Sequence, residues 1–164
     1  MKTKSILLAV ALICIALLGY AFYLQHGRDM LPCPLCIVQR YAFAAIALIC
    51  LIFVFLPKSV ARVGAGLASI AGISGAVVAG RHLWIKANPT MTCGIDPLET
   101  SLNTIPTAVW FPSLFKADGL CTADYDPIFG LSIPAWAMLW FVVLSLVLLW
   151  VAFFRREPEQ RYFG

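Results

Sequence analysis

The sequence predicts an all-α membrane protein, a bundle of four transmembrane helices with a long extracytoplasmic loop between helices three and four. Of its 164 residues, 62% are hydrophobic and only 12% are charged, too few polar side chains to cover a soluble globule. The apolar residues gather in four blocks of about 20 residues, the helix length that crosses a hydrocarbon core. Residues 1–164 are therefore interpreted as one integral membrane domain. No basic patch with interleaved aromatic residues predicts nucleic-acid binding.

The four blocks cover residues 5–24, 37–56, 63–83 and 134–154, leaving external loops at 25–36 and 84–133. Most basic residues lie before the first block, in the link after the second, or after the fourth: Lys2, Lys4, Lys58, Arg62, Arg155, Arg156 and Arg161. The positive-inside rule assigns such segments to the cytoplasm. Both termini are therefore predicted to be cytoplasmic, and both loops to face the other compartment.

The first block has the basic start of a secretory signal. Its apolar run is too long for a signal peptide, so an uncleaved anchor is expected. Cys14 in this block and Cys50 in the second lie among aliphatic residues. Both are interpreted as small core side chains without a catalytic role.

The second block begins beside a vicinal dithiol, Cys33-Pro34-Leu35-Cys36, with Arg40 four residues further on. Proline has a preset φ and no N–H, so Pro34 suits the first position of a helix. Cys33 is then expected near the N-cap and Cys36 at about the third helical position. There the helix macrodipole and Arg40 both favour a thiolate. The pattern predicts a reactive pair; a structural disulfide and a pair of buried thiols are the alternatives.

The third block carries small residues at every fourth position, which predicts a smooth helix face that a neighbouring helix can approach closely. These residues are Gly64, Ala68, Gly72, Ala76 and Gly80. His82 follows at the outer end of the block. A boundary histidine with satisfied hydrogen bonds is the plain interpretation, but an ionisable group at a membrane helix end beside a dithiol is also a candidate functional residue.

The loop over residues 84–133 contains several prolines and two cysteines, Cys93 and Cys121. Between them, the aromatic-rich run at 109–115 is too short to span a bilayer and is expected to lie flat in its interface. Four outward-facing cysteines allow three disulfide pairings, and spacing alone does not select one. A zinc site built from the four thiolates is the rival interpretation, but the second pair lacks C-x-x-C spacing.

Together these features resemble the DsbB family of bacterial inner-membrane disulfide oxidoreductases. The resemblance covers essentially the whole chain. It rests on Cys33-Pro34-Leu35-Cys36 with Gln39-Arg40-Tyr41, on the loop pair Cys93 and Cys121, and on the run FGLSIPAW at 129–136.

The resemblance implies a thiol:quinone oxidoreductase that reoxidises a DsbA-like periplasmic thiol oxidase and passes two electrons to a membrane quinone, either ubiquinone or menaquinone. Both cysteine pairs would face the periplasm, and the favoured resting disulfides are Cys33–Cys36 and Cys93–Cys121. Cys93 would be attacked by the partner's thiolate, with Cys121 released. Cys33 would then exchange with the loop pair through a transient bridge to Cys121.

The same resemblance assigns the quinone-facing residues. Cys36 would be the sulfur that meets the quinone ring, Arg40 would hold the ring there, and His82 lies near the position of a quinone-lining histidine. No metal ligand is implied.

Two other classes of protein remain as alternatives. A vitamin K epoxide reductase-like enzyme also combines four helices, a C-x-x-C and loop cysteines, but its active C-x-x-C comes late in the chain. A non-enzymatic structural membrane protein with disulfide-braced loops has no need for Cys33, Cys36 and Arg40 on neighbouring helical turns.

Overall fold

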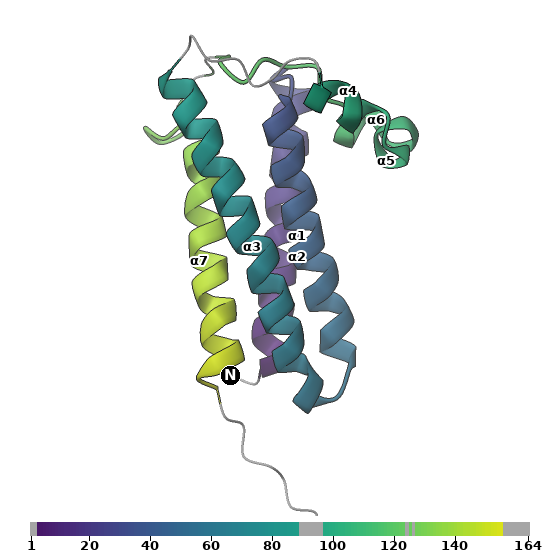
Figure 1. Cartoon of the computed structure of the whole chain (residues 1–164), viewed down its shortest axis with the longest axis vertical. Coiled ribbons are helices and arrows are strands. Elements are labelled where there is room, and N and C mark those ends of the chain that lie inside the picture. The colour runs from purple at the N-terminus through teal and green to yellow at the C-terminus, as the bar shows by residue number, and fades with distance from the viewer. Residues whose placement is uncertain (1–2, 89–96, 124, 126, 156–164) are drawn as a thin grey trace, which may run out of the picture.

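The computed structural model describes residues 3–88, 97–123, 125 and 127–155. Four long helices lie side by side in one bundle (Figure 1): α1 (Thr3–Gly27), α2 (Pro34–Phe55), α3 (Lys58–Ala87) and α7 (Ile133–Phe153). Three short helices lie at the end of the bundle opposite the N-terminus: α4 (Pro97–Asn103), α5 (Pro106–Trp110) and α6 (Pro112–Phe115). Each long helix is long and apolar enough to cross a membrane, which confirms the predicted fold class.

The helices α1 and α3 are longer than their predicted blocks at both ends, whereas α2 and α7 begin earlier and end one residue earlier than predicted. The long helix α2 begins at Pro34 with Cys33 as its N-cap, as the proline geometry predicts. The helix α3 begins at Lys58, directly after Pro57, and continues to Ala87, so the prediction of 63–83 was short at both ends. Hydropathy marks only the part of a helix that matches the hydrocarbon core, whereas polar helix formers continue the helix beyond it.

Helix α3 packs against both α2 and α7, and α1 packs against α2. Cys14 and Cys50 are fully buried in the core that these helices share, in agreement with their interpretation as core side chains. The outward faces carry exposed aliphatic residues such as Leu12, Ile70 and Leu146. In a bilayer these side chains would face lipid, which is as apolar as they are.

The predicted close approach along the small-residue face of α3 is found only in the first half of the helix. A Cβ at Gly72 would overlap the Ser145 side chain of α7, whereas one at Gly80 would meet nothing within 4 Å. In the second half the close contact is made by Gly75, which lies against the ring of Phe141. A spacing of four residues advances about 40° beyond a full turn at 3.6 residues per turn, so the buried face drifts to intermediate positions.

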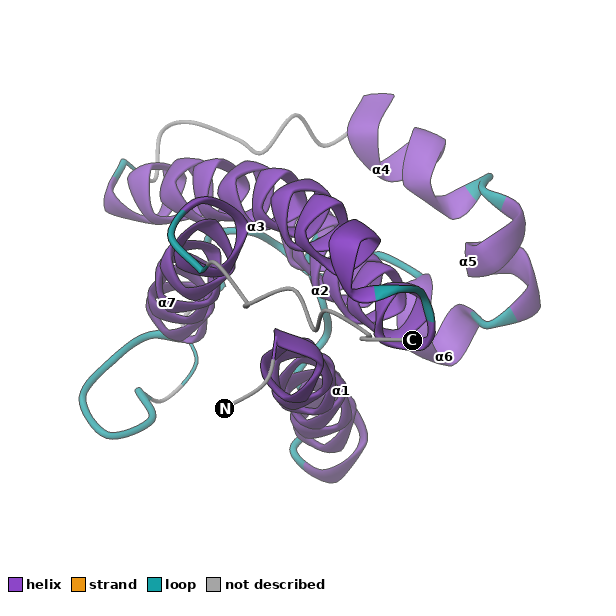
Figure 2. Ribbon diagram, turned by 90° about the horizontal axis from the view of Figure 1, so that it is seen from below, coloured by secondary structure: helices purple, strands orange, loops and turns teal. Residues whose placement is uncertain are grey.

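The short helices form an arc beside α2 and α3, on the side away from α7 (Figure 2). Val109, Trp110 and Phe111 in this region are 62%, 73% and 56% exposed. The predicted flat aromatic run is therefore a pair of short helical turns with outward apolar side chains. Its contact with a membrane interface stays a prediction.

Candidate functional site

The dithiol lies at the start of α2. Cys33 and Cys36 are free thiols with their sulfurs 2.8 Å apart, the reduced form of the pair expected to be bridged at rest. The Cys36 backbone N–H donates to Cys33 Sγ at 3.3 Å, because an N-cap side chain faces the unpaired N–H groups of the first turn. The hydrogen bond to Cys36 and then burial raise the pKa of the Cys33 thiol, which therefore stays protonated at neutral pH.

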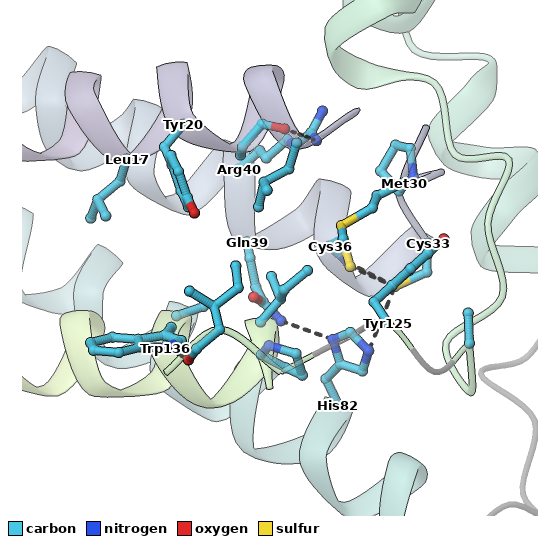
Figure 3. Close-up of a pocket in the computed structure, with 18 of the residues that line it drawn as sticks. Leu17, Tyr20, Met30, Cys33, Cys36, Gln39, Arg40, His82, Tyr125 and Trp136 are labelled. Atoms are coloured by element: carbon cyan, nitrogen blue, oxygen red, sulfur yellow. Dashed lines mark hydrogen bonds between the residues drawn. The ribbon is translucent and has the colours of Figure 1, made fainter. Parts of the chain in front are cut away.

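His82 of α3 lies directly against this dithiol (Figure 3). Its Nε2 is 3.7 Å from Cys33 Sγ and 3.3 Å from the carbonyl oxygen of Cys121. Its Nδ1 is 3.3 Å from the side-chain nitrogen of Gln39. With only 4% of its surface exposed, the imidazole has protein partners for both ring nitrogens. The histidine contacts the Cys33 side of the dithiol.

Cys121 comes to the same place from the loop between α6 and α7. It is disulfide-bonded, while its predicted partner Cys93 lies outside the described residues. Cys121 Sγ, Cys33 Sγ and a ring nitrogen of His82 all lie within 4.8 Å of one another. A disulfide sulfur carries no thiolate charge, so in this form Cys121 cannot supply the thiolate that the zinc alternative requires of it.

Arg40 points away from the sulfurs toward α1 and the loop. Its guanidinium donates to Gln25 Oε1 and to the Leu114 carbonyl, both at 2.7 Å, and to the Ala21 carbonyl at 3.3 Å. These acceptors are neutral, so the described contacts leave its charge without a carboxylate partner. The residue thereby joins α1, α2 and the end of α6, and it also lines the cavity described next.

A cavity of ≈ 450 Å³ lies beside the dithiol, within the size range of small-molecule sites. Its walls are mostly apolar and come from the long helices and the external loop. They include Leu17, Leu24, Phe43, Trp136 and Trp140. Cys36, half-buried, faces this space.

The polar groups of the cavity include those of Cys33, Cys36, Gln39, Arg40 and His82, and Lys86, Tyr20 and Tyr125 also line it. A thiol, an imidazole and a cation beside apolar walls fit a flat ring with carbonyl oxygens, which needs apolar contact on its faces and polar groups at its edge. The five predicted site residues inside the described part of the chain, Cys33, Cys36, Arg40, His82 and Cys121, thus lie at one end of the bundle.

Two contacts were not predicted from the sequence. Gln39, 6% exposed, contacts His82, and Gln25 accepts from Arg40. A partner for Gln39 could have been predicted from the sequence, because burying an amide inside an apolar membrane helix is costly unless it has a specific hydrogen-bond partner. No local pattern marks Gln25, which lies near the end of α1 among ordinary loop-facing residues.

The fold and this site define a multi-helix membrane protein with a thiol–disulfide centre beside an apolar cavity. The family model of the disulfide bond formation protein DsbB matches residues 3–151. The chain belongs to the DsbB family, whose function is disulfide bond formation.

Several curated relatives bear the name Disulfide bond formation protein B. The protein from Herminiimonas arsenicoxydans is 60% identical over 156 residues, which cover 95% of this chain and 99% of the relative. Those from Ralstonia nicotianae and Cupriavidus metallidurans are 44% and 42% identical, over 95% and 98% of this chain and 97% and 98% of theirs.

Proposed function

We propose that this protein reoxidises a DsbA-like thiol oxidase of the periplasm and passes the two electrons to a membrane quinone. The observation that carries the proposal is the approach of Cys33 Sγ to Cys121 Sγ, within 4.8 Å, beside an apolar cavity that Cys36 lines. A thiol this close to a disulfide sulfur needs only a small movement for exchange.

The first exchange takes place in the external loop. The partner's thiolate attacks Cys93, the bond between Cys93 and Cys121 breaks, and Cys121 leaves as a thiolate. Cys121 then attacks Cys33, the bond between Cys33 and Cys36 breaks, and the electron pair moves to Cys36. Attack by the partner's second thiol on the mixed disulfide releases the oxidised partner.

Re-formation of the loop disulfide completes the transfer. The freed Cys93 attacks Cys121, and Cys33 leaves as a thiol after taking up a proton. The net result is that the pair Cys33 and Cys36 holds the two electrons, while the two protons of the partner's dithiol pass to Cys33 and to water. In the described residues, Cys121 is disulfide-bonded while Cys33 and Cys36 are free thiols, the redox state that this sequence of steps reaches.

Cys36, Arg40 and His82 are the residues that would hold the quinone, with the apolar walls excluding water. When bound, a quinone supplies a sink for two electrons and two protons, matching the oxidation of a dithiol. Arg40 presents a fixed positive charge at this end of the cavity, which stabilises negative charge developing on an oxygen nearby. Membrane insertion would follow the positive-inside prediction, with both termini in the cytoplasm and the cysteine pairs in the periplasm.

The test is anaerobic addition of reduced DsbA to the purified protein, with quinone absorbance followed over time. Loss of the oxidised-quinone spectrum is expected, and it should require all four of Cys33, Cys36, Cys93 and Cys121. Cys121→Ser should accumulate a mixed disulfide with DsbA, while Cys93→Ser should form none and retain the quinone. Absence of electron transfer in the unaltered protein would overturn the proposal.

A further inference from the structure

A chain of hydrogen-bonding groups runs from α2 through α3 and back to the dithiol (Figure 3). The Gln39 amide nitrogen lies 3.3 Å from His82 Nδ1, His82 Nε2 lies 3.7 Å from Cys33 Sγ, and Cys33 Sγ lies 2.8 Å from Cys36 Sγ. Gln39 and His82 are 6% and 4% exposed. Because both side chains are buried, their protons are set by these neighbours and not by bulk water.

The Cys121 carbonyl fixes the direction of this chain. Its oxygen, 3.3 Å from His82 Nε2, accepts hydrogen bonds and cannot donate them. In this hydrogen bond Nε2 carries the proton, and its one N–H is shared between the Cys121 oxygen and Cys33 Sγ. In a neutral imidazole the other nitrogen is then an acceptor, and it faces the amide nitrogen of Gln39, which donates.

We propose that Gln39 is a positioning residue: by donating to Nδ1 it holds His82 as the neutral Nε2–H tautomer, so that His82 donates toward Cys33 and the Cys33 proton is directed to Cys36. His82 is then a hydrogen-bond donor to the dithiol and not the base that deprotonates Cys33. The identification of this dithiol as catalytic rests on the proposed function.

The consequence is an ordered distribution of charge in the reduced pair. Cys33 Sγ accepts from His82 Nε2 and from the Cys36 backbone N–H, so its own S–H is free to point at Cys36 Sγ. The negative charge then lies on Cys36, the sulfur that faces the cavity. In the opposite tautomer, Cys33 would donate to Nε2 and Cys36 would lose its donor.

The tautomer is measured directly by ¹⁵N spectra of histidine-labelled protein. The chain has two histidines, so His26→Gln leaves His82 as the only labelled ring. We expect a protonated Nε2 and a bare Nδ1. Gln39→Leu should lower the share of the Nε2–H tautomer, because only the Cys121 carbonyl then favours it, and Gln39→Glu should protonate both nitrogens, because a carboxylate attracts a second proton to Nδ1. A bare Nε2 in the parent, or an unchanged spectrum in Gln39→Leu, would overturn the proposal.

The position of the thiolate is measured by alkylation of the reduced dithiol at neutral pH, in a Cys93→Ala/Cys121→Ala background that keeps the backbone carbonyl at 121. Fragment mass spectrometry should find several-fold more label on Cys36 than on Cys33. Gln39→Leu should remove this preference and Gln39→Glu should restore it. Gln25→Leu, which removes an amide that contacts Arg40 and not His82, should keep it.

Equal labelling ratios in the parent and in Gln39→Leu would contradict the role given to Gln39. Neither measurement uses a quinone or a thiol oxidase. A failure of the proposed function would instead appear as a parent protein that reduces no quinone, so the two failures are distinguishable.

Discussion

Cys33 and Cys36 have different surroundings although they share one helical turn. Both line the cavity, but Cys33 is 2% exposed and lies against His82 and Cys121, whereas Cys36 is half-buried. One sulfur is thus placed for exchange with the loop and the other for contact with a ligand in the cavity. The two side chains share a helix face, since they are three residues apart and their sulfurs lie 2.8 Å from each other, so the difference comes from the neighbouring elements that cover Cys33.

Arg40 gives the first prediction at this scale. One nitrogen of its planar guanidinium donates to Gln25 and to the Leu114 carbonyl, and the other donates to the Ala21 carbonyl, a two-nitrogen fork that an ammonium does not reproduce. We expect Arg40→Lys to raise the KM for quinone several-fold and Arg40→Ala to raise it more. The mixed disulfide between Cys93 and DsbA should still form, because that exchange takes place in the loop.

Steady-state quinone reduction measures the KM for quinone in each variant. Arg81→Lys, a change of the same kind at an exposed position, is the matched control and should leave KM as it is. An unchanged KM in Arg40→Ala would mean that Arg40 serves only to brace α1 against the loop.

The buried thiols of Cys14 and Cys50 give the second prediction. Both are fully buried in the core and lie outside the cavity lining. Replacing both by Ala should preserve turnover and lower thermal stability slightly, since each change removes about one buried heavy atom at a cost of about 1 kcal/mol. A loss of turnover beyond the loss of folded protein would show that one of them takes part in the reaction.

At the scale of helices, α3 is the element that aligns the site. It packs on α2 and α7, and its glycines let those helices come close enough to bring His82 to the level of the dithiol. Gly75 lies against Phe141, whose ring stacks on Phe43 of α2 with centroids 3.9 Å apart. The register of α3 therefore depends on a few positions without a side chain.

A matched pair of substitutions tests this dependence. Gly75→Ala would place a methyl group in the Phe141 ring, and overpacking of this kind costs about 1–3 kcal/mol. Gly80→Ala meets nothing within 4 Å and should be neutral or slightly stabilising, because alanine favours a helix by up to about 1 kcal/mol. Thermal unfolding in detergent measures both. A comparable loss in the two variants would contradict the close contact at Gly75.

At the scale of the whole molecule, the short helices lie at the end of the bundle opposite the N-terminus (Figure 1). The dithiol at the start of α2 and His82 near the end of α3 belong to this end, and Cys121 lies against them. The link between α2 and α3 lies at the other end. This separation places all of the candidate chemistry on one side of a membrane that the four helices cross. The charge distribution predicts that this side is the periplasm.

Labelling of single cysteines tests the orientation. In a background with Cys33, Cys36, Cys93 and Cys121 replaced by Ser, Val109→Cys should react with a membrane-impermeant maleimide in cells with a permeabilised outer membrane. Leu56→Cys, in the link, should react only after the inner membrane is disrupted. Both parent residues are exposed, at 62% and 36%. The reverse pattern of labelling would invert the predicted topology.

The sequence by itself determined the features that depend on local chemistry. Apolar blocks of about 20 residues define the membrane helices, and Pro34 defines where α2 begins, so the places of Cys33 and Cys36 on the first turn were predictable. The ends of the helices were less predictable, because a hydropathy pattern does not mark the residues that continue a helix beyond the lipid.

Only the tertiary structure decided which side chains meet. His82 contacts Cys33 across 49 residues of sequence, and Arg40 reaches Leu114 across 74. Such contacts depend on the rotation and register of one helix against another, which in this protein are set by close packing at positions such as Gly72 and Gly75. Lipid solvates all apolar faces of a helix alike, so a hydropathy pattern alone does not fix that rotation. The partners of Gln39 and Arg40 follow from the packing and not from their own segments of sequence.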